Sequence, residues 1–271
     1  MAAADFIPFS SRSRTKIVAT IGPACRGVEK LTQLVLAGAD VFRINSAHGS
    51  EADRLACLQE VREVEKKVGI PVGILLDLAG PKIRLGELVQ DPTNCEAGGM
   101  FTFVRGNKPS GPGELSSNYE VLIDELHVGD PVMLADGTVS MVVTEKTADT
   151  AVCKVVGAGT IRSRQGINLP GTKLSTPALT DADLANVTWA AKHNVDIVSL
   201  SFVRSPEEIR QLKILLRGNG SQAFVVAKIE KREAMDRLDD IVAATDGVMV
   251  ARGDLGVEID FAEIAVAQKR I

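Results

Sequence analysis

Short apolar segments rich in β-branched residues alternate with segments of helical character, and this alternation constrains the fold more than any other feature of the chain. Strands are expected at 16–22, 40–45 and 73–80, with helices between them at 29–38 and 51–67. The expected strands are apolar on both faces, which is typical of a parallel sheet that helices cover on its two sides.

The same alternation returns after the segment NLPG at 168–171. Strands are expected at 196–203, 223–230 and 247–254. Helices are expected at 180–193, from 205 onward, at 231–240 and at 260–271. The whole pattern makes about six strand–helix units, whereas eight units close a barrel of about 250 residues. The sequence therefore predicts an α/β fold, a (β/α)8 TIM-type barrel that is incomplete, and we expect a truncated form of a longer protein.

Residues 86–166 interrupt this alternation. They hold many Gly and Pro residues, the alternating runs FTFV, VMLADGTVSMVV and AVCKVVGAG, and little helical character beyond the short turn VLIDEL. Asp136-Gly137, which separates two apolar runs, indicates a β-hairpin. We therefore expect residues 1–85 and 167–271 to form the barrel domain, and residues 86–166 to form an inserted all-β lid domain.

The composition narrows the classes of function. The chain has 271 residues, a net charge of −4, one Trp and one Tyr, which disfavours nucleic acid as a partner. No apolar run is long enough for a membrane span or a signal peptide, so no membrane partner is expected. The four cysteines form no CxxC pair and the three histidines are dispersed, so zinc spacing is absent and a reduced, cytoplasmic setting fits best.

Polar side chains gather where the expected strands end. Barrel enzymes build their active sites at the carboxyl ends of the strands, and strand interiors otherwise bury apolar groups. An ion pair of Lys228 with Glu230 would explain the polar residues of one strand end only. The residues concerned are Arg43, Asn45, Asp77, Ser201, Arg204, Lys228, Glu230, Arg252 and Asp254.

These residue types favour one kind of chemistry. Glu230 and Asp254 follow neighbouring strands, and two such carboxylates suit a hard cation such as Mg²⁺ or Mn²⁺. Strand alternation places Lys228 on the side of Glu230, where an ammonium can neutralise an enolate or a transferring phosphoryl group. Arg43 and Arg84 supply planar donors for phosphate. Phosphoryl transfer or enolate chemistry is therefore indicated, whereas the glycine motifs of P-loop and Rossmann sites are missing.

Seven motifs follow one another between Thr15 and Ile271, namely TKIVATIGPA, RINSAHG, DLAGPKIR, NLPG, SFVR, AKIE and MVARGDLGVE. In this order they resemble the pyruvate kinase family, whose members transfer a phosphoryl group from phosphoenolpyruvate to ADP and release pyruvate and ATP in glycolysis. The resemblance implies a Mg²⁺-dependent phosphotransferase that is a homo-oligomer at full length. It also implies that a proton-transfer residue of the family lies beyond Ile271.

The resemblance assigns roles to the residues that match the motifs. Arg43 and Arg84 would contact the transferring phosphoryl group, and Lys228 would stabilise that group and the enolate oxygen. Glu230 and Asp254 would bind the metal ion. Further substrate contacts would come from Ser201, Phe202, Ala251, Arg252 and Gly253, and nucleotide contacts from Asn45, His48, Arg84 and Asp136, with the lid closing over the nucleotide.

Departures from the family's pattern suggest a subgroup that does not require K⁺. Ala47 and Leu78 stand where most members have Ser and Thr ligands of a K⁺ ion, and Lys82 stands where they have Glu. The resemblance implies that the Lys82 ammonium places a charge near the K⁺ site. Asn45 and Asp77 would then contact or neutralise Lys82.

Gln165 is another departure, because many members carry a phosphate-binding Lys there, and the adjacent Arg164 could supply that charge instead. Two other functions stay open. A metal-dependent pyruvate-enolate aldolase or lyase would use the same carboxylate pair, although it needs no nucleotide lid. A chain that lacks barrel strands could also be a catalytically incomplete fragment that binds ligand weakly or pairs with another polypeptide.

Overall fold

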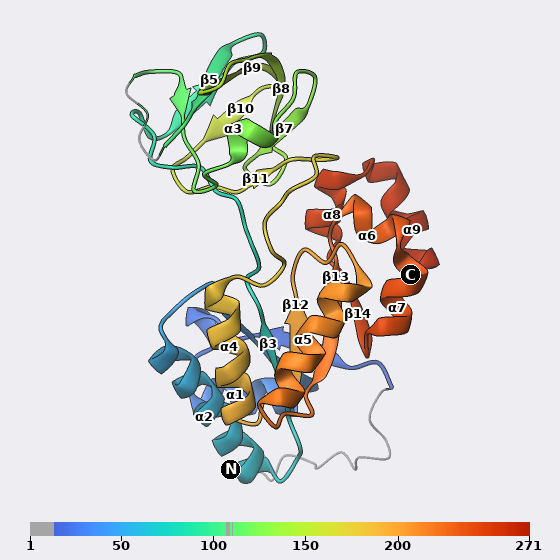
Figure 1. Cartoon of the computed structure of the whole chain (residues 1–271). Coiled ribbons are helices and arrows are strands. Elements are labelled where there is room, and N and C mark those ends of the chain that lie inside the picture. Colours follow the sequence, from blue (N-terminus) through green and yellow to red (C-terminus); the bar gives the residue numbers. More distant parts are fainter. Residues whose placement is uncertain (1–13, 107–108, 110) are drawn as a thin grey trace.

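One sheet of six parallel strands, in the order β1-β2-β3-β12-β13-β14, forms the centre of the barrel region in this computed structural model (Figure 1). The structure describes residues 14–106, 109 and 111–271. The six strands are those that the sequence predicts. They span Ile17–Thr20 (β1), Ala39–Asn45 (β2), Gly73–Asp77 (β3), Ile197–Leu200 (β12), Phe224–Ile229 (β13) and Gly247–Val250 (β14).

The register of the sheet brings polar residues together at its carboxyl end. Asn45 on β2 lies opposite Asp77 on β3, and Asp77 lies opposite Ser199 on β12. Lys228 on β13 lies one strand further along, opposite Met249 of β14. Because the strands are parallel, residues near the end of each strand meet at the same edge of the sheet.

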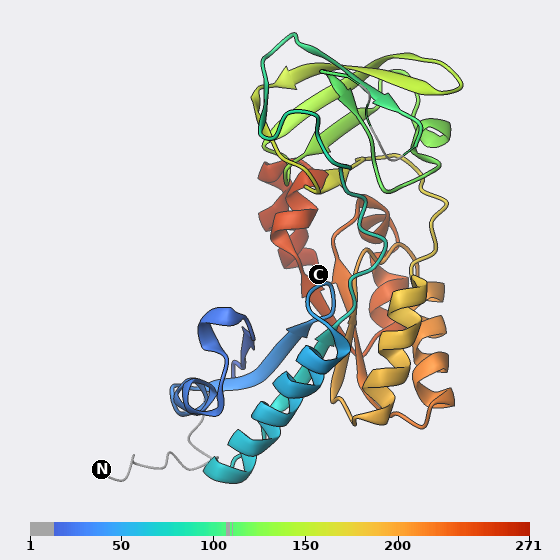
Figure 2. The ribbon, with the colours of Figure 1, turned by 90° about the vertical axis from the view of Figure 1, so that its left-hand side faces the viewer.

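The β insert (residues 86–166) lies beyond the carboxyl ends of the barrel strands (Figure 2). Its main sheet has the order β11-β7-β8-β9-β5-β6, in which β11 comes from the two residues that follow the insert, and β10 pairs with β4. The hairpin predicted at Asp136-Gly137 joins β7 to β8, and both residues have the positive φ angles, 54° and 84°, that such tight turns need. The elements are β4 (Thr93–Cys95), β5 (Met100–Val104), β6 (Glu114–Leu115), α3 (Leu122–Glu125), β7 (Pro131–Leu134), β8 (Val139–Lys146), β9 (Thr150–Gly157), β10 (Gly159–Ile161) and β11 (Ile167–Asn168).

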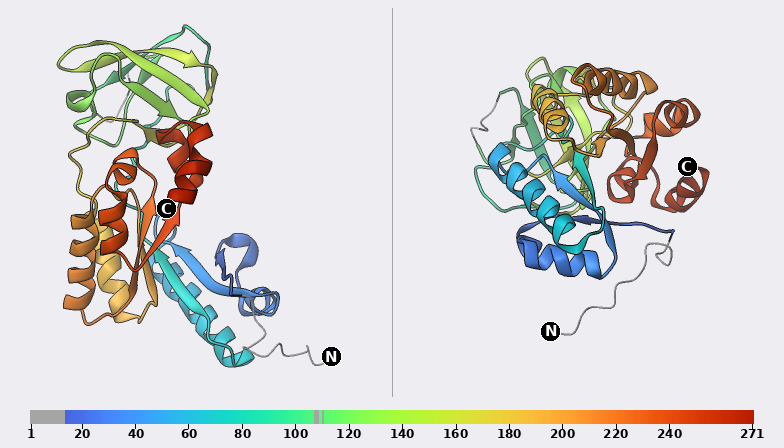
Figure 3. Two further views of the ribbon diagram at one scale, coloured as in Figure 1. Left: turned by 90° about the vertical axis from the view of Figure 1, so that its right-hand side faces the viewer. Right: turned by 90° about the horizontal axis from the view of Figure 1, so that it is seen from below.

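Helices surround the parallel sheet on its outside (Figure 3). Ser50 caps α2, since its Oγ accepts a hydrogen bond from the Asp53 N–H at 3.2 Å, and Thr180 caps α4 in the same way. None of the helices in the described ranges is both long and apolar enough to cross a bilayer. They are α1 (Val28–Leu36), α2 (Glu51–Val68), α4 (Asp181–Lys192), α5 (Pro206–Gly218), α6 (Arg232–Asp236), α7 (Leu238–Ala244), α8 (Arg252–Glu258) and α9 (Ile264–Arg270), with 3-10 turns at Pro23–Cys25 and Phe261–Glu263.

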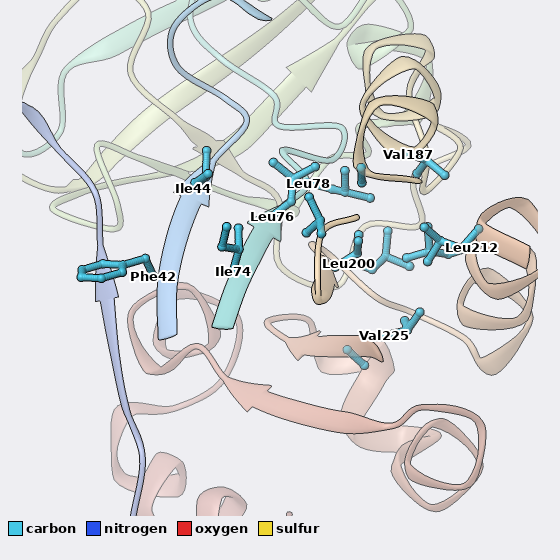
Figure 4. Close-up of a cluster of buried hydrophobic side chains, with 14 of the residues drawn as sticks. Phe42, Ile44, Ile74, Leu76, Leu78, Val187, Leu200, Leu212 and Val225 are labelled. Atoms are coloured by element: carbon cyan, nitrogen blue, oxygen red, sulfur yellow. The ribbon is translucent and has the colours of Figure 1, made fainter. Parts of the chain in front are cut away.

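Three separate clusters of apolar side chains hold these layers together. The largest joins the parallel sheet to its helices, for example Leu76 of β3, Leu200 of β12 and Leu212 of α5 (Figure 4). The β insert has a core of its own, which includes Leu134 and Met141. The smallest cluster joins α8 to α9 through Leu255, Ile259, Ile264 and Ala267. Met235 of α6 and Val250 of β14 also pack against this smallest cluster, and Met235 packs against the largest cluster as well.

The strands expected at 73–80 and 196–203 end early, at Asp77 and Leu200. Two further segments differ more from the sequence-based expectation. The strand expected at 247–254 ends at Val250, so Arg252 and Asp254 lie in the first turn of α8 instead of on a strand. An acidic residue in the first turn is favoured by the helix dipole, which explains why a helix begins here. The helix expected at 231–240 is divided at Arg237 into α6 and α7.

Candidate active site

A connected cluster of charged and hydroxyl side chains occupies the carboxyl end of the parallel sheet, and Asp77 lies at its centre with 3% of its side chain exposed. Arg43 donates to Asp77 Oδ2 from Nε at 3.0 Å and from Nη2 at 2.5 Å. Ser199 donates to Asp77 Oδ1 at 2.6 Å. Arg43 Nη1 also donates to Thr20 Oγ1 at 2.9 Å. The guanidinium is therefore held in one orientation by charge-assisted bonds.

The Lys228 ammonium lies beside this carboxylate. It donates to Ser201 Oγ at 2.8 Å, and the Ser201 hydroxyl donates in turn to the Leu78 carbonyl at 2.7 Å. Its Nζ also lies 2.8 Å from Glu230 Oε1 and 3.5 Å from Asp77 Oδ1. With 11% of its side chain exposed, Lys228 is a positive charge that three neighbours hold at the end of β13.

Glu230 is buried, with 1% of its side chain exposed, and only one of its oxygens is hydrogen-bonded. The Phe202 N–H donates to Oε2 at 2.7 Å. Lys228 stands close to Oε1 as an ion-pair partner, but no donor in the described ranges points at this oxygen in hydrogen-bond geometry. Burial raises the pKa of Glu230, the Lys228 charge opposes that rise, and the Asp254 charge adds to it. A buried carboxylate that pairs with the Lys228 ammonium at 2.8 Å and lies beside a second carboxylate is an arrangement whose remaining negative charge a cation would offset.

Asp254 supplies that second carboxylate. The Asp254 charge raises the pKa of Glu230. Within the part of the chain that the structure describes, no hydrogen bond or ion pair holds the Asp254 side chain itself. Asp77, Glu230 and Asp254 outnumber the cationic Arg43 and Lys228 by one, so the cluster carries an excess negative charge. Oxygen ligands with excess negative charge fit Mg²⁺ or Mn²⁺. The described residues hold no group of three or more His, Cys, Asp or Glu side chains that could bind a metal ion.

The segment between β14 and α8 carries three of the predicted substrate contacts. The Ala251 N–H donates to the Ile229 carbonyl at 3.3 Å, which ties the start of α8 to the end of β13. Arg252 and Gly253 are exposed and follow directly. These residues therefore border the Glu230 end of the cluster and are open to a ligand.

Ser201 and Phe202, the other two predicted substrate contacts, form the turn after β12. Phe202 adopts a φ of 54°, a conformation that non-glycine residues seldom take, and its N–H is the donor to Glu230. Gly80 lies against this turn, since a Cβ at Gly80 would come within 2.9 Å of Phe202 Cδ2. The absence of a side chain at Gly80 thus allows the turn that orients Glu230.

Two predicted residues lie at the junction with the β insert instead of within the cluster. Arg84 Nη1 donates to the Arg164 carbonyl at 3.2 Å. Asp136 is exposed in the hairpin turn, and its Oδ1 lies 3.6 Å from the position that a Cβ on Gly166 would take. Neither side chain joins the hydrogen bonds or ion pairs of the Asp77 cluster, so in this structure the insert and the cluster face each other without direct contact between these groups.

Lys82 lies at the same junction, because its Cε comes within 3.1 Å of the Cβ position of Gly166. The predicted contacts of Lys82 with Asp77 and Asn45 are not formed among the described residues. Asp77 is instead occupied by Arg43 and Ser199, as given above, and Asn45 Oδ1 accepts a hydrogen bond from the Ala47 N–H at 3.0 Å. The physical reason is that Lys82 follows the course of the chain toward the insert, away from the strand ends.

The predicted nucleotide residues Asn45 and His48 line one hollow beside the cluster. Thr20, which accepts from Arg43, lines the same hollow, together with Pro23 and Gly49. His48 is exposed. The hollow is therefore open to solvent and borders Thr20, whose hydroxyl accepts the hydrogen bond from Arg43.

The predicted substitute for the missing lid lysine has other partners. Arg164 forms an exposed ion pair with Glu87 at 2.5 Å. Gln165 Oε1 accepts a hydrogen bond from the Arg162 N–H at 2.7 Å, so its side chain is folded back on its own turn. Neither side chain extends toward the cluster.

Sequence reasoning missed two features of the site. Ser199, which bonds to Asp77, could have been found, because alternation places it on the same face of its apolar strand as Ser201. The ion pair of Lys231 with Glu258, at 2.5 Å and with 7% and 0% of the side chains exposed, had no local signal, since the two residues are far apart in sequence. Burial raises the pKa of Glu258, and the Lys231 charge opposes that rise.

A family sequence model described as "Pyruvate kinase, barrel domain" matches residues 12–271. The chain belongs to the pyruvate kinase family. The pyruvate kinase of Mycobacterium intracellulare is 42% identical over 257 residues, which cover 95% of this chain and 54% of that protein. "Pyruvate kinase 2" of Synechocystis sp. is 40% identical over 264 residues, which cover 95% of this chain and 44% of that protein.

A solved structure of a pyruvate kinase from Cryptosporidium parvum has the same fold, with a TM-score of 0.89 and 36% identity over 94% of this chain and 54% of that one. The family and the TIM-type α/β fold that the sequence predicts are thereby confirmed. The chain spans about half the length of the curated pyruvate kinases it matches.

Proposed function

We propose that the chain carries the catalytic face of a Mg²⁺- or Mn²⁺-dependent pyruvate kinase, which transfers the phosphoryl group of phosphoenolpyruvate to ADP and yields ATP and pyruvate. The observation that carries this proposal is the Lys228 ammonium, held 2.8 Å from both Ser201 Oγ and Glu230 Oε1. In that position it can neutralise the transferring phosphoryl group and the enolate oxygen without rearrangement. The four free cysteines agree with a cytoplasmic enzyme of glycolysis.

The other residues of the cluster would each bind a different part of the substrate. Arg43, oriented by Asp77 and Thr20, would bind phosphoryl oxygens, and the turn at Ser201 and Phe202 would face the reacting end of the substrate. The substrate carboxylate would lie against Ala251, Arg252 and Gly253. A divalent ion on Glu230 and Asp254 would supply Lewis-acid stabilisation of the developing negative charge.

We propose that residues 1–85 and 167–271 form the barrel domain and that residues 86–166 act as its lid. The hairpin of the insert already reaches the barrel, because a Cβ on Gly137 would lie 3.3 Å from Val257 Cγ2 of α8. Arg84 and Asp136 at the junction, with Asn45 and His48 in the hollow below, would contact the nucleotide. Closure of such a lid would exclude water from the phosphoryl group.

We also propose that the enzyme does not require K⁺. Ala47 offers no hydroxyl ligand, and Leu78 is fully buried and apolar. The charge of Lys82 would act from the insert junction, where it lies in this structure, and lid closure would bring it nearer the strand ends. The measurement is turnover with Na⁺, K⁺ or a large organic cation as the only monovalent salt. A strong stimulation by K⁺ would contradict this part of the proposal.

The central test is a lactate dehydrogenase-coupled assay with phosphoenolpyruvate, ADP and Mg²⁺, on this chain and on one extended to the length of its relatives. Turnover is expected for the extended chain. Lys228→Met should lower its kcat by about 100-fold or more, because it removes a charge aimed at the reacting group. Mn²⁺ binding should persist in this variant, since both carboxylates remain.

Lys213→Met is the matched control, because Lys213 forms an ion pair with Asp246 at the opposite end of the strands. Its kcat should equal that of the unmodified protein. An extended chain that releases no pyruvate from phosphoenolpyruvate and ADP would exclude the proposed reaction. If it instead cleaves an aldol substrate, the metal-dependent aldolase or lyase becomes the better assignment.

A further inference from the structure

The Lys231–Glu258 ion pair is the most deeply buried charge pair outside the cluster described above. Both side chains are at least nine-tenths buried, and Nζ lies 2.5 Å from Glu258 Oε1. Glu258 Oε2 finds no hydrogen-bond partner among the described residues, so Lys231 is the partner that the structure shows for this carboxylate. A buried pair of this kind costs desolvation energy that an apolar pair of the same size would not cost. Its presence therefore calls for a reason other than stability alone.

The two residues lie close in sequence to the two carboxylates of the candidate metal site. Lys231 follows Glu230 directly at the end of β13, and Glu258 lies one helical turn after Asp254 on α8. The pair thus joins the segment that carries the first candidate ligand to the helix that carries the second.

Helix α8 is also held by apolar contacts. Leu255, Ile259, Ile264 and Ala267 form a small cluster against which Met235 of α6 and Val250 of β14 pack, and Val257 lies near Gly137 of the insert. The Asp254 carboxylate has no polar partner of its own in the described part of the chain, as noted above. Where Asp254 lies relative to Glu230 therefore depends on where α8 as a whole is held.

We propose that Lys231 and Glu258 are positioning residues, which set the distance between Glu230 and Asp254 and thereby the affinity for a divalent cation. This inference rests on the proposed metal-binding role of those two carboxylates. The physical reason is that metal ligands must be held within a narrow range of positions. A change in a residue that orients a ligand therefore often lowers the metal affinity strongly.

The test measures Mn²⁺ affinity by electron paramagnetic resonance of free Mn²⁺, using this chain without substrate. The double variant K231M/E258L replaces the ion pair by apolar groups of similar size, so that no unpaired charge stays buried. Its Mn²⁺ affinity should fall by about 10-fold or more relative to the unmodified chain. Thermal unfolding followed by circular dichroism should show that the variant keeps its fold.

Two further variants make the outcome decisive. Lys213→Met removes an ion pair remote from the site and should leave the Mn²⁺ affinity unchanged. Glu258→Asp keeps the buried charge and its partner but shortens the link, so it should fold and still weaken Mn²⁺ binding, which covers the case in which the double variant does not fold. Unchanged affinity in the folded double variant, or in Glu258→Asp, would overturn the positioning role.

Glu230→Gln separates this inference from the proposed function. If the unmodified chain does not bind Mn²⁺, or if Glu230→Gln binds it equally well, the metal site itself is wrong and the positioning role falls with it. If Glu230→Gln loses Mn²⁺ while K231M/E258L keeps it, the metal site stands and only the positioning role is rejected.

Discussion

The carboxyl end of the parallel sheet and the β insert treat charged side chains in opposite ways. In the barrel, Asp77, Lys228 and Glu230 have 3%, 11% and 1% of their side chains exposed. In the insert, the Arg105–Asp124 pair has 37% and 56% exposed, and the pair of Arg164 with Glu87 has 80% and 60%. The charges named in both regions are paired, but only those at the carboxyl end of the sheet have been removed from water.

The exposed ion pairs of the insert and the buried charges of the barrel differ in their energetic cost. Exposed ion pairs contribute little to stability, so those of the insert act as a solvated surface. Buried charges lose hydration energy, and apolar side chains would fill the same space at lower cost. The barrel keeps them where the strands end, which is where the proposed substrate and cation would recover that energy by binding.

The largest difference in stability between the two regions is expected for substitution of Asp77. Asp77→Ala would leave the Arg43 guanidinium and the Ser199 hydroxyl without their shared acceptor, and breaking a buried pair typically costs about 3–5 kcal/mol. We expect urea unfolding of the barrel to shift by that order. The matched change in the insert, Arg105→Ala, should shift the unfolding of the insert only slightly. Equal small shifts in both variants would show that the buried cluster is not energetically distinct.

The second comparison concerns the two cores. Leu76 of the barrel and Leu134 of the insert are both fully buried, so Leu76→Ala and Leu134→Ala are the same chemical change in two places. Each should cost about 2–5 kcal/mol, and each should lower hydrogen-exchange protection mainly in its own sheet, because the two apolar clusters are separate. A loss of protection across both sheets from either variant would mean that they unfold as one cooperative unit.

The alternation of strands and helices was readable in the sequence because each element signals itself locally. Ser50 and Thr180 mark helix starts, and β-branched apolar runs mark the parallel strands. The boundary at Val250 was misplaced for the same reason, since the charged segment after it suits either a strand end or a first helical turn. The helix dipole favours Asp254 in the first turn of α8, but the local pattern alone did not separate this case from a strand end.

In the candidate site, too, the features that depend on local sequence were predicted, and those that depend on tertiary packing were not. Alternation along β13 predicts that Lys228 and Glu230 share a side, and the structure places them 2.8 Å apart. The position of Lys82 depends on how the insert is oriented over the barrel, and the Lys231–Glu258 pair depends on how α8 folds back on β13. Both are consequences of tertiary packing between segments distant in sequence, so motif and periodicity could not supply them.

The smallest expected effect concerns the reactivity of the cysteine thiols in the two regions. Cys153 of the insert is fully buried, and burial raises its pKa from 9.0 to about 12. Burial also raises the pKa of Cys57 in the barrel and of Cys95 in the insert. Cys25, in the turn after β1, is only partly buried. At pH 8 we therefore expect one thiol, Cys25, to react quickly with a disulfide reagent, and the other three to react only on unfolding.

The sign of the alkaline dependence follows from the Cys153 thiol. Between pH 9 and pH 12 the unfolded chain loses this proton while the folded insert keeps it, so stability is fully present below the unfolded pKa and is lost as pH rises through the folded one. Cys153→Val should flatten this dependence for the insert and leave the barrel unchanged, because the thiol lies between strands of the insert alone. If the variant and the unmodified chain lose stability in parallel as the pH rises, other groups than this buried thiol control the alkaline unfolding of the insert.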